Sequence, residues 1–159
     1  MIDRPVGDVL KGKGTRDLVV VDGALTVYEA VGQMNQKGLG SVVIQGKDGT
    51  VAGIFTERDL MRRVVGEGRD PKATALSAVM TPNVRRMAAT EPVSEVLRVM
   101  VEHGYRHMVI DENGRSVGLV SIRDLMRWLI LPDQPVAHEG RRGVIKTKAE
   151  DTVATIRQG

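Results

Sequence analysis

The chain has 159 residues, which is enough for one compact domain or two small halves. Its 42% apolar residues supply a core, and aromatic residues, at 3%, contribute little to it. The absence of cysteine excludes disulfides, thiolate zinc sites and cysteine nucleophiles. The net charge of +3 favours anionic ligands but falls well short of a nucleic-acid footprint, since the only basic cluster is in the tail, at Arg141, Arg142, Lys146 and Lys148.

No apolar run approaches the ~20 residues that a membrane span needs, and the first residues lack the pattern of a signal peptide. We therefore expect a soluble, cytoplasmic protein with no membrane partner. The eight methionines are expected to fill gaps in the core rather than to bind metal.

The first predicted elements are a short helical turn over residues 6–10 and an extended stretch over residues 18–21. A longer helix follows, because apolar residues recur at the spacing of one helical face. These residues are Val27, Ala30, Val31 and Met34. Thr26 and Glu29 have the spacing of a capping box at its start, and Gly38 is the stop signal.

The next elements predict a hairpin and a second helix. Residues 41–44 and 51–55 are short apolar strands, and Asp48-Gly49 marks the turn between them. The second helix begins at Thr56 and carries Leu60, Met61, Val64 and Val65.

After a linker over residues 66–72, the same order of elements returns. The second copy comprises a helical turn over 76–80, extended residues 84–87, a helix from Val93 to the stop at Gly104, strands over 107–110 and 116–120 around Asn113-Gly114, and a helix from Ser121. The offset between copies is 66 residues up to the hairpin turn and 65 after it. Such a repeat indicates a pseudo-symmetric pair in which both copies share their chemistry.

The strongest local motif is Gly-x-x-Ser/Thr-x-x-Asp, which stands at residues 53–59 and again at residues 118–124. Ser/Thr-x-x-Asp is a helix-capping pattern, and taken alone it favours a structural role. Three features favour a ligand instead. A helix N-terminus suits phosphate, Arg58 and Arg123 lie in the first turn, and the preceding glycine permits close backbone approach. An aspartate at this place can accept both hydroxyls of a ribose.

The repeated units, the two motifs and the Val79-Met80-Thr81-Pro82 before the second copy resemble tandem cystathionine-β-synthase (CBS) domains over about residues 6–131. The resemblance implies an α+β fold of two β-α-β-β-α motifs, over 6–66 and 76–131, packed through their sheets with helices outside. A polar, basic tail over 132–159 follows. The family further implies two clefts between the sheets that bind AMP, ATP, S-adenosylmethionine or NAD(H), and a homodimer formed through helices.

Carried over by residue, the resemblance places the ribose-binding acids at Asp59 and Asp124 and the phosphate-side hydroxyls at Thr56 and Ser121, with Arg58 and Arg123 beside them. The implied base-contacting segments are Gly40, Ser41 and Val42 in one copy and Arg106, His107 and Met108 in the other. The implied lining of the adenine from the other side is Leu18 and Val19, and Thr81, Asn83 and Val84. Many members have proline where this chain has Met108.

The two copies differ around this motif. Gly40-Ser41 is small and neutral, whereas Arg106-His107 is bulky and basic, and Glu57 stands where the second copy has Ile122. We therefore expect the second copy to hold the better monophosphate site and the first to take another ligand or bind more weakly.

No nucleophile, general base or metal cluster can be argued from spacing, and His138 in the tail has no partner at metal spacing. We expect a non-enzymatic regulatory module without a catalytic cofactor. It senses an adenine nucleotide (AMP or ATP, with NAD(H) as a further candidate) and signals to a separate effector protein. The alternative is an adaptor that binds nucleic acid or protein through its basic tail, with the repeated pair as scaffold.

Overall fold

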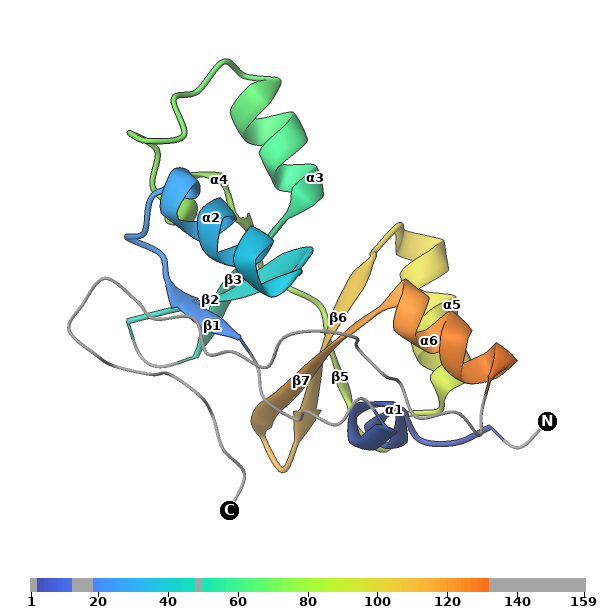
Figure 1. Cartoon of the computed structure of the whole chain (residues 1–159). Coiled ribbons are helices and arrows are strands. Elements are labelled where there is room, and N and C mark those ends of the chain that lie inside the picture. Colours follow the sequence, from blue (N-terminus) through green and yellow to red (C-terminus); the bar gives the residue numbers. More distant parts are fainter. Residues whose placement is uncertain (1–2, 13–18, 48–49, 132–159) are drawn as a thin grey trace. The chain divides into compact units, whose positions relative to one another are not determined.

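The computed structural model describes residues 3–12, 19–47 and 50–131. These residues form two compact units, each with its own sheet and helices (Figure 1). We call residues 19–84 the β1–β4 unit, and residues 3–12 with 85–131 the β5–β7 unit. Leu18, the Asp48-Gly49 turn and the basic tail lie outside the described residues.

The β1–β4 unit holds a four-stranded sheet in the order β1-β2-β3-β4. Its strands are β1 (Val20–Asp22), β2 (Ser41–Gln45), β3 (Val51–Thr56) and β4 (Thr81–Pro82). β1 runs parallel to β2, whereas β3 is antiparallel to both of its neighbours. Its helices are α2 (Val27–Lys37), α3 (Glu57–Asp59), the π-helix η1 (Leu60–Val65) and α4 (Leu76–Val79).

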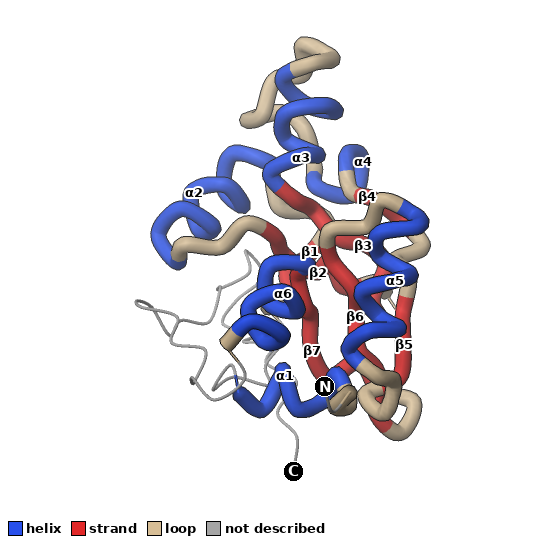
Figure 2. Tube along the Cα trace, turned by 90° about the vertical axis from the view of Figure 1, so that its right-hand side faces the viewer, coloured by secondary structure: helices blue, strands red, loops and turns tan. Residues whose placement is uncertain are grey.

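The β5–β7 unit repeats this plan with a three-stranded sheet in the order β5-β6-β7 (Figure 2). Its elements are α1 (Val6–Gly12), β5 (Arg86–Ala88), α5 (Val93–His103), β6 (His107–Glu112), β7 (Arg115–Ser121) and α6 (Ile122–Ile130). β5 is parallel to β6, and β6 is antiparallel to β7. Each copy is therefore β-α-β-β-α, which confirms the predicted α+β fold.

Local sequence signals account for most element boundaries. The capping box of Thr26 and Glu29 is present, with the Glu29 amide donating to Thr26 Oγ1 at 3.3 Å. Gly38 and Gly104 end α2 and α5 in the left-handed conformation, with φ of 63° and 69°. Asn113 and Gly114, with φ of 51° and 76°, form the β6–β7 turn as a two-residue hairpin signal requires.

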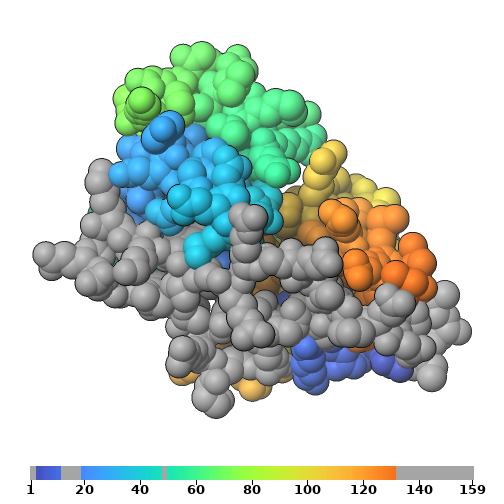
Figure 3. All heavy atoms as spheres, in the orientation of Figure 1, coloured from blue at the N-terminus to red at the C-terminus, as the bar shows by residue number. Residues whose placement is uncertain are grey.

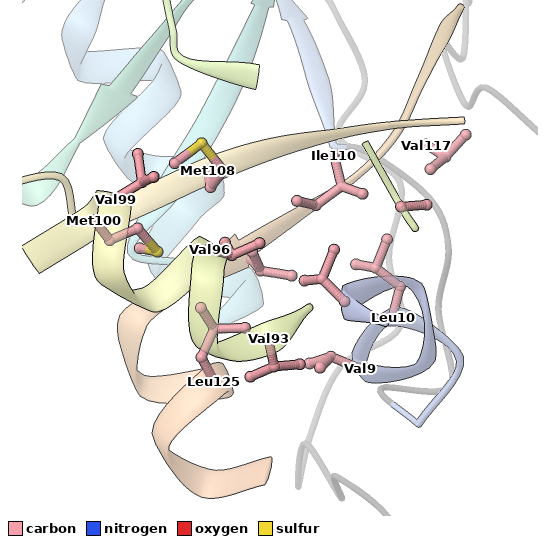
Figure 4. Close-up of a cluster of buried hydrophobic side chains, with 13 residues drawn as sticks. Val9, Leu10, Val93, Val96, Val99, Met100, Met108, Ile110, Val117 and Leu125 are labelled. Carbon is pink, nitrogen blue, oxygen red and sulfur yellow. The ribbon is translucent and has the colours of Figure 1, made fainter. Parts of the chain in front are cut away.

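Each unit has a separate hydrophobic core, to which a short helix that precedes the other copy's first strand contributes. Figure 4 shows the β5–β7 core, in which Val9 and Leu10 of α1 lie beside the strands and α5. In the β1–β4 unit, Leu76 and Val79 of α4 have the corresponding role. α1 therefore packs on the second copy of the repeat, although in the chain it lies at the start of the first copy, 6–66.

The second helix of the first copy differs from the regular helix that the apolar pattern predicts. After the single turn of α3, the Gly66 amide donates to the Met61 carbonyl at 2.8 Å, the spacing of a π-helix. Val64 is buried, but Met61 and Val65 are 61% and 71% exposed. The pattern predicted the helix but not its π geometry, because apolar spacing does not distinguish i→i+5 bonding.

α6 is a regular helix whose inner face carries the buried Leu125 and the partly buried Trp128. Its outer side chains contribute to the surface, where α6 is orange in Figure 3. Among the described residues, no helix combines the length and apolar character needed to cross a membrane.

Candidate functional site

In the β1–β4 unit, the sheet brings the start of β2 next to the end of β3. Ser41 pairs with Thr56 and Val42 with Phe55. The Glu57 amide then donates to the Gly40 carbonyl at 3.1 Å, which continues the ladder into the turn. The segment Gly40–Val42 therefore lies beside the Thr56–Asp59 motif.

The Thr56–Asp59 turn is a complete capping box. Thr56 Oγ1 accepts from the Asp59 amide at 3.2 Å, and Asp59 Oδ2 accepts from the Thr56 amide and hydroxyl, each at 3.0 Å. Asp59 is only 7% exposed. The structural role expected of this pattern is therefore confirmed for this copy.

Asp59 also contacts residues outside its own turn. Thr81 Oγ1 of β4 donates to Asp59 Oδ1 at 3.0 Å, and Arg63 Nε lies 3.6 Å from the same oxygen. Arg63 Nη1 donates in addition to the Met80 carbonyl. The carboxylate thus ties the turn to β4, and Arg63 takes part in a way that sequence reasoning missed. Its position four residues after Asp59 was the available signal.

Of the three residues predicted from the β4 region, only Thr81 reaches this turn. β4 runs antiparallel to β3, with Ile54 opposite Thr81 and Gly53 opposite Pro82. The chain after Pro82 therefore runs towards the start of β3, and it carries Asn83 and Val84 away from Asp59. Asn83 leaves the strand with a positive φ of 52°.

The β5–β7 unit repeats the turn. His107 pairs with Ser121 and Met108 with Val120, and the Ile122 amide donates to the Arg106 carbonyl at 3.0 Å. Asp124 Oδ2 accepts from the Ser121 amide at 2.7 Å and from its hydroxyl at 2.8 Å. The Asp124 amide in turn donates to Ser121 Oγ at 3.2 Å, so this capping box is complete as well.

Two of the predicted base-contacting residues, Val42 and Met108, have buried side chains that belong to the cores of their units. Packing within each unit therefore occupies these two side chains. The strand start that flanks β2 is marked by Val19, whose carbonyl accepts from the Val43 amide at 3.0 Å. In the second unit, Arg85 makes the equivalent bond to the Val109 amide, at 3.3 Å. Arg85 is thus the counterpart of Val19, as the alignment of the extended stretches 18–21 and 84–87 predicts.

Both motif arginines are exposed. Neither Arg58 nor Arg123 forms an ion pair or a side-chain hydrogen bond within the described part of the chain. Each is therefore available to an anion beside its capped turn.

The glycine that opens each motif accommodates the protein's own chain. A Cβ on Gly53 would lie 2.7 Å from both the Thr81 carbonyl oxygen and Met80 Sδ. A Cβ on Gly118 would lie 2.5 Å from both δ carbons of Leu10. Close approach was expected here, but it is made by the segments that pack on β3 and β7.

Over the described residues, no three His, Asp or Glu side chains gather as a metal site would require.

Comparison with known proteins identifies the repeated unit. The family model for the CBS domain matches residues 6–66 and again residues 76–131. The mitochondrial CBS domain-containing protein CBSX3 of Arabidopsis thaliana is 33% identical over 137 residues, which cover 79% of this chain and 64% of the relative. An uncharacterised protein of Methanopyrus kandleri is 32% identical over 77% of this chain and 61% of its own length. The chain thus spans less than two thirds of these relatives.

Solved structures agree with the sequence relatives. A CBS-domain-containing protein from Agrobacterium tumefaciens is 36% identical, with a TM-score of 0.72, over 79% of this chain and 93% of that one. A candidate signal-transduction protein with CBS domains from Burkholderia ambifaria is also 36% identical, with a TM-score of 0.75, over 82% and 96% of the two chains. The chain belongs to the CBS-domain family, of which it carries a tandem pair.

Proposed function

We propose that this CBS pair is a non-enzymatic regulatory module that binds adenosine-containing nucleotides at its two capped turns. The observation that carries the proposal is common to both units. A nearly buried aspartate is held by a capping box, and an exposed arginine that pairs with no other described residue lies next to it.

The capped carboxylate of Asp59 retains capacity for a ribose. An ionised carboxylate offers about four acceptor positions. In Asp59, Oδ2 serves the cap, while Oδ1 accepts from the Thr81 hydroxyl, which can rotate to another acceptor. A ribose hydroxyl donating to Oδ1 would thus take the place of Thr81. Phosphate oxygens would then accept charge-assisted hydrogen bonds from Arg58, or from Arg123 in the other unit.

The contact between Asp59 and Thr81 supports a regulatory output. Thr81 belongs to β4, which leads into residues 83–85, where the chain passes from one unit to the other. A ligand that displaces Thr81 therefore changes the bonding of the connecting segment, and a separate effector protein would read this change.

Exposed apolar side chains on α5 and α6, at Val101, Met126 and Ile130, support the homodimer that we propose with it. A cytoplasmic location stays a prediction.

A thermal-shift panel tests this function. AMP, ADP, ATP, S-adenosylmethionine, NAD and NADH are each added to the full chain, and a ligand at 100 times its Kd should stabilise it by about 2.7 kcal/mol. Asp59→Asn and Asp124→Asn keep a capping oxygen but remove a carboxylate, so each should lose the response of one unit. A wild-type chain that responds to none of the six compounds refutes the proposal. Measurable turnover of ATP would refute the statement that the module is non-enzymatic.

A further inference from the structure

We propose that Glu57 makes the β1–β4 turn select against phosphate monoesters in favour of adenosine phosphodiesters, whereas the β5–β7 turn favours the monoester. This inference rests on the proposed nucleotide function and adds a charge preference to each of its two sites.

The Glu57 carboxylate lies against the backbone of Gly40. The Glu57 amide donates to the Gly40 carbonyl at 3.1 Å. A Cβ on Gly40 would lie 3.5 Å from Glu57 Cδ and 3.6 Å from each carboxylate oxygen. A negative charge therefore occupies the place where the β2 segment meets the capped turn, and the cation Arg58 is the next residue in the chain.

The equivalent place in the β5–β7 unit lacks this negative charge. Ile122 replaces Glu57 and packs, partly buried, against the hydrophobic core. Arg106 replaces Gly40, and its carbonyl accepts from the Ile122 amide at 3.0 Å. Arg106 and Arg123 are both exposed, and neither side chain pairs with another described residue. Two such cations thus flank this turn. The β1–β4 turn has the cation Arg58 and the anion Glu57, and its other arginine, Arg63, is already paired with Asp59.

The difference matters because phosphate esters differ in charge. A monoester carries close to two negative charges above its second pKa of about 6, whereas a diester carries one. A carboxylate about 4 Å from an extra negative charge in a water-like environment weakens binding by about fivefold. Glu57 should therefore disfavour the monoester relative to the diester by about fivefold at the β1–β4 turn. At the β5–β7 turn, Arg106 and Arg123 reverse the preference.

The test uses two probes that differ by one charge, AMP and its 5′-methyl ester, in calorimetric titrations of the full chain at pH 8. Asp124→Asn isolates the β1–β4 turn, and Asp59→Asn isolates the β5–β7 turn. In the Asp124→Asn background, adding Glu57→Gln should raise the affinity for AMP relative to the ester by about fivefold. In the Asp59→Asn background, adding Ile122→Glu should lower the same affinity ratio by a similar factor. Glu67→Gln, an exposed glutamate in the linker, makes the same change in net charge away from the turn and should leave the ratio unchanged.

The outcomes separate the inference from the function beneath it. If both probes bind but Glu57→Gln leaves their ratio unchanged, or if Glu67→Gln changes it equally, the charge selection is refuted and nucleotide binding stands. If neither probe binds the wild-type chain, nucleotide binding itself is refuted and the selection falls with it.

Discussion

Gly118→Ala should destabilise the β5–β7 unit by forcing α1 away from β7. Gly118 pairs with Ile110 in the sheet, and an added Cβ would lie 2.5 Å from both δ carbons of Leu10 and 3.1 Å from its γ carbon. Leu10 is 2% exposed, so its side chain lies within the core. Overpacking of this kind costs about 1–3 kcal/mol. Replacing glycine by alanine within a strand returns roughly 0.5 kcal/mol. The net expected loss is about 0.5–2.5 kcal/mol.

A double-mutant cycle with Leu10→Ala tests the cause. Leu10→Ala alone should cost about 2–5 kcal/mol, because it leaves a cavity in the core. In that background the alanine at position 118 meets no δ carbon, so Gly118→Ala should cost nothing or stabilise slightly. The coupling free energy is therefore about 1–2 kcal/mol.

Urea unfolding followed by the fluorescence of Trp128 measures this cycle. Trp128 is the only tryptophan of the chain and packs against the same core as Leu10, so it reports on this unit. Additive effects of the two substitutions, within about 0.5 kcal/mol, would show that α1 does not pack on β7.

Three further predictions concern single contacts. Gly53→Ala should lower the free energy of unfolding in urea by about 1–3 kcal/mol, because its Cβ would lie 2.7 Å from the Thr81 carbonyl oxygen and backbone must move. An unchanged free energy of unfolding would contradict this. Thr81→Val should cost about 1 kcal/mol by removing the 3.0 Å hydrogen bond to Asp59, and a neutral result would show that the bond is not formed in solution. The hydrogen bond from Arg98 holds the pKa of Glu95 below its ordinary value of 4.5. The ionised Glu95 therefore stabilises the fold fully above pH 4.5, and this stabilisation is lost as the pH falls through the lowered pKa. Arg98→Met should raise the Glu95 pKa in an NMR titration, whereas an unchanged value would exclude the contact.

Local signals predicted the elements because each depends on neighbours in the chain. The capping box at Thr26, the left-handed stop at Gly38 and the Asn113-Gly114 turn all depend on residues a few positions apart. The Ser121 and Thr56 turns were predicted for the same reason, including their caps. The repeat then extended each signal from one copy to the other.

Long-range packing was less accessible to sequence. Nothing in residues 6–10 indicates that α1 packs on the second copy, because that choice depends on the contact between Leu10 and Gly118. The hydrogen bond from Thr81 to Asp59 likewise joins residues of separate elements, 22 positions apart. Apolar periodicity carries no signal for either.

The most direct test of nucleotide binding is the titration of AMP into the isotopically labelled full chain, followed by two-dimensional amide NMR. Binding at the capped turns predicts saturable shifts in residues 40–42 and 56–59 and in residues 106–108 and 121–124. Asp59→Asn should remove the first set and Asp124→Asn the second. Amide signals of these four segments that stay unmoved at saturating AMP, or shifts confined to other residues, would contradict the account.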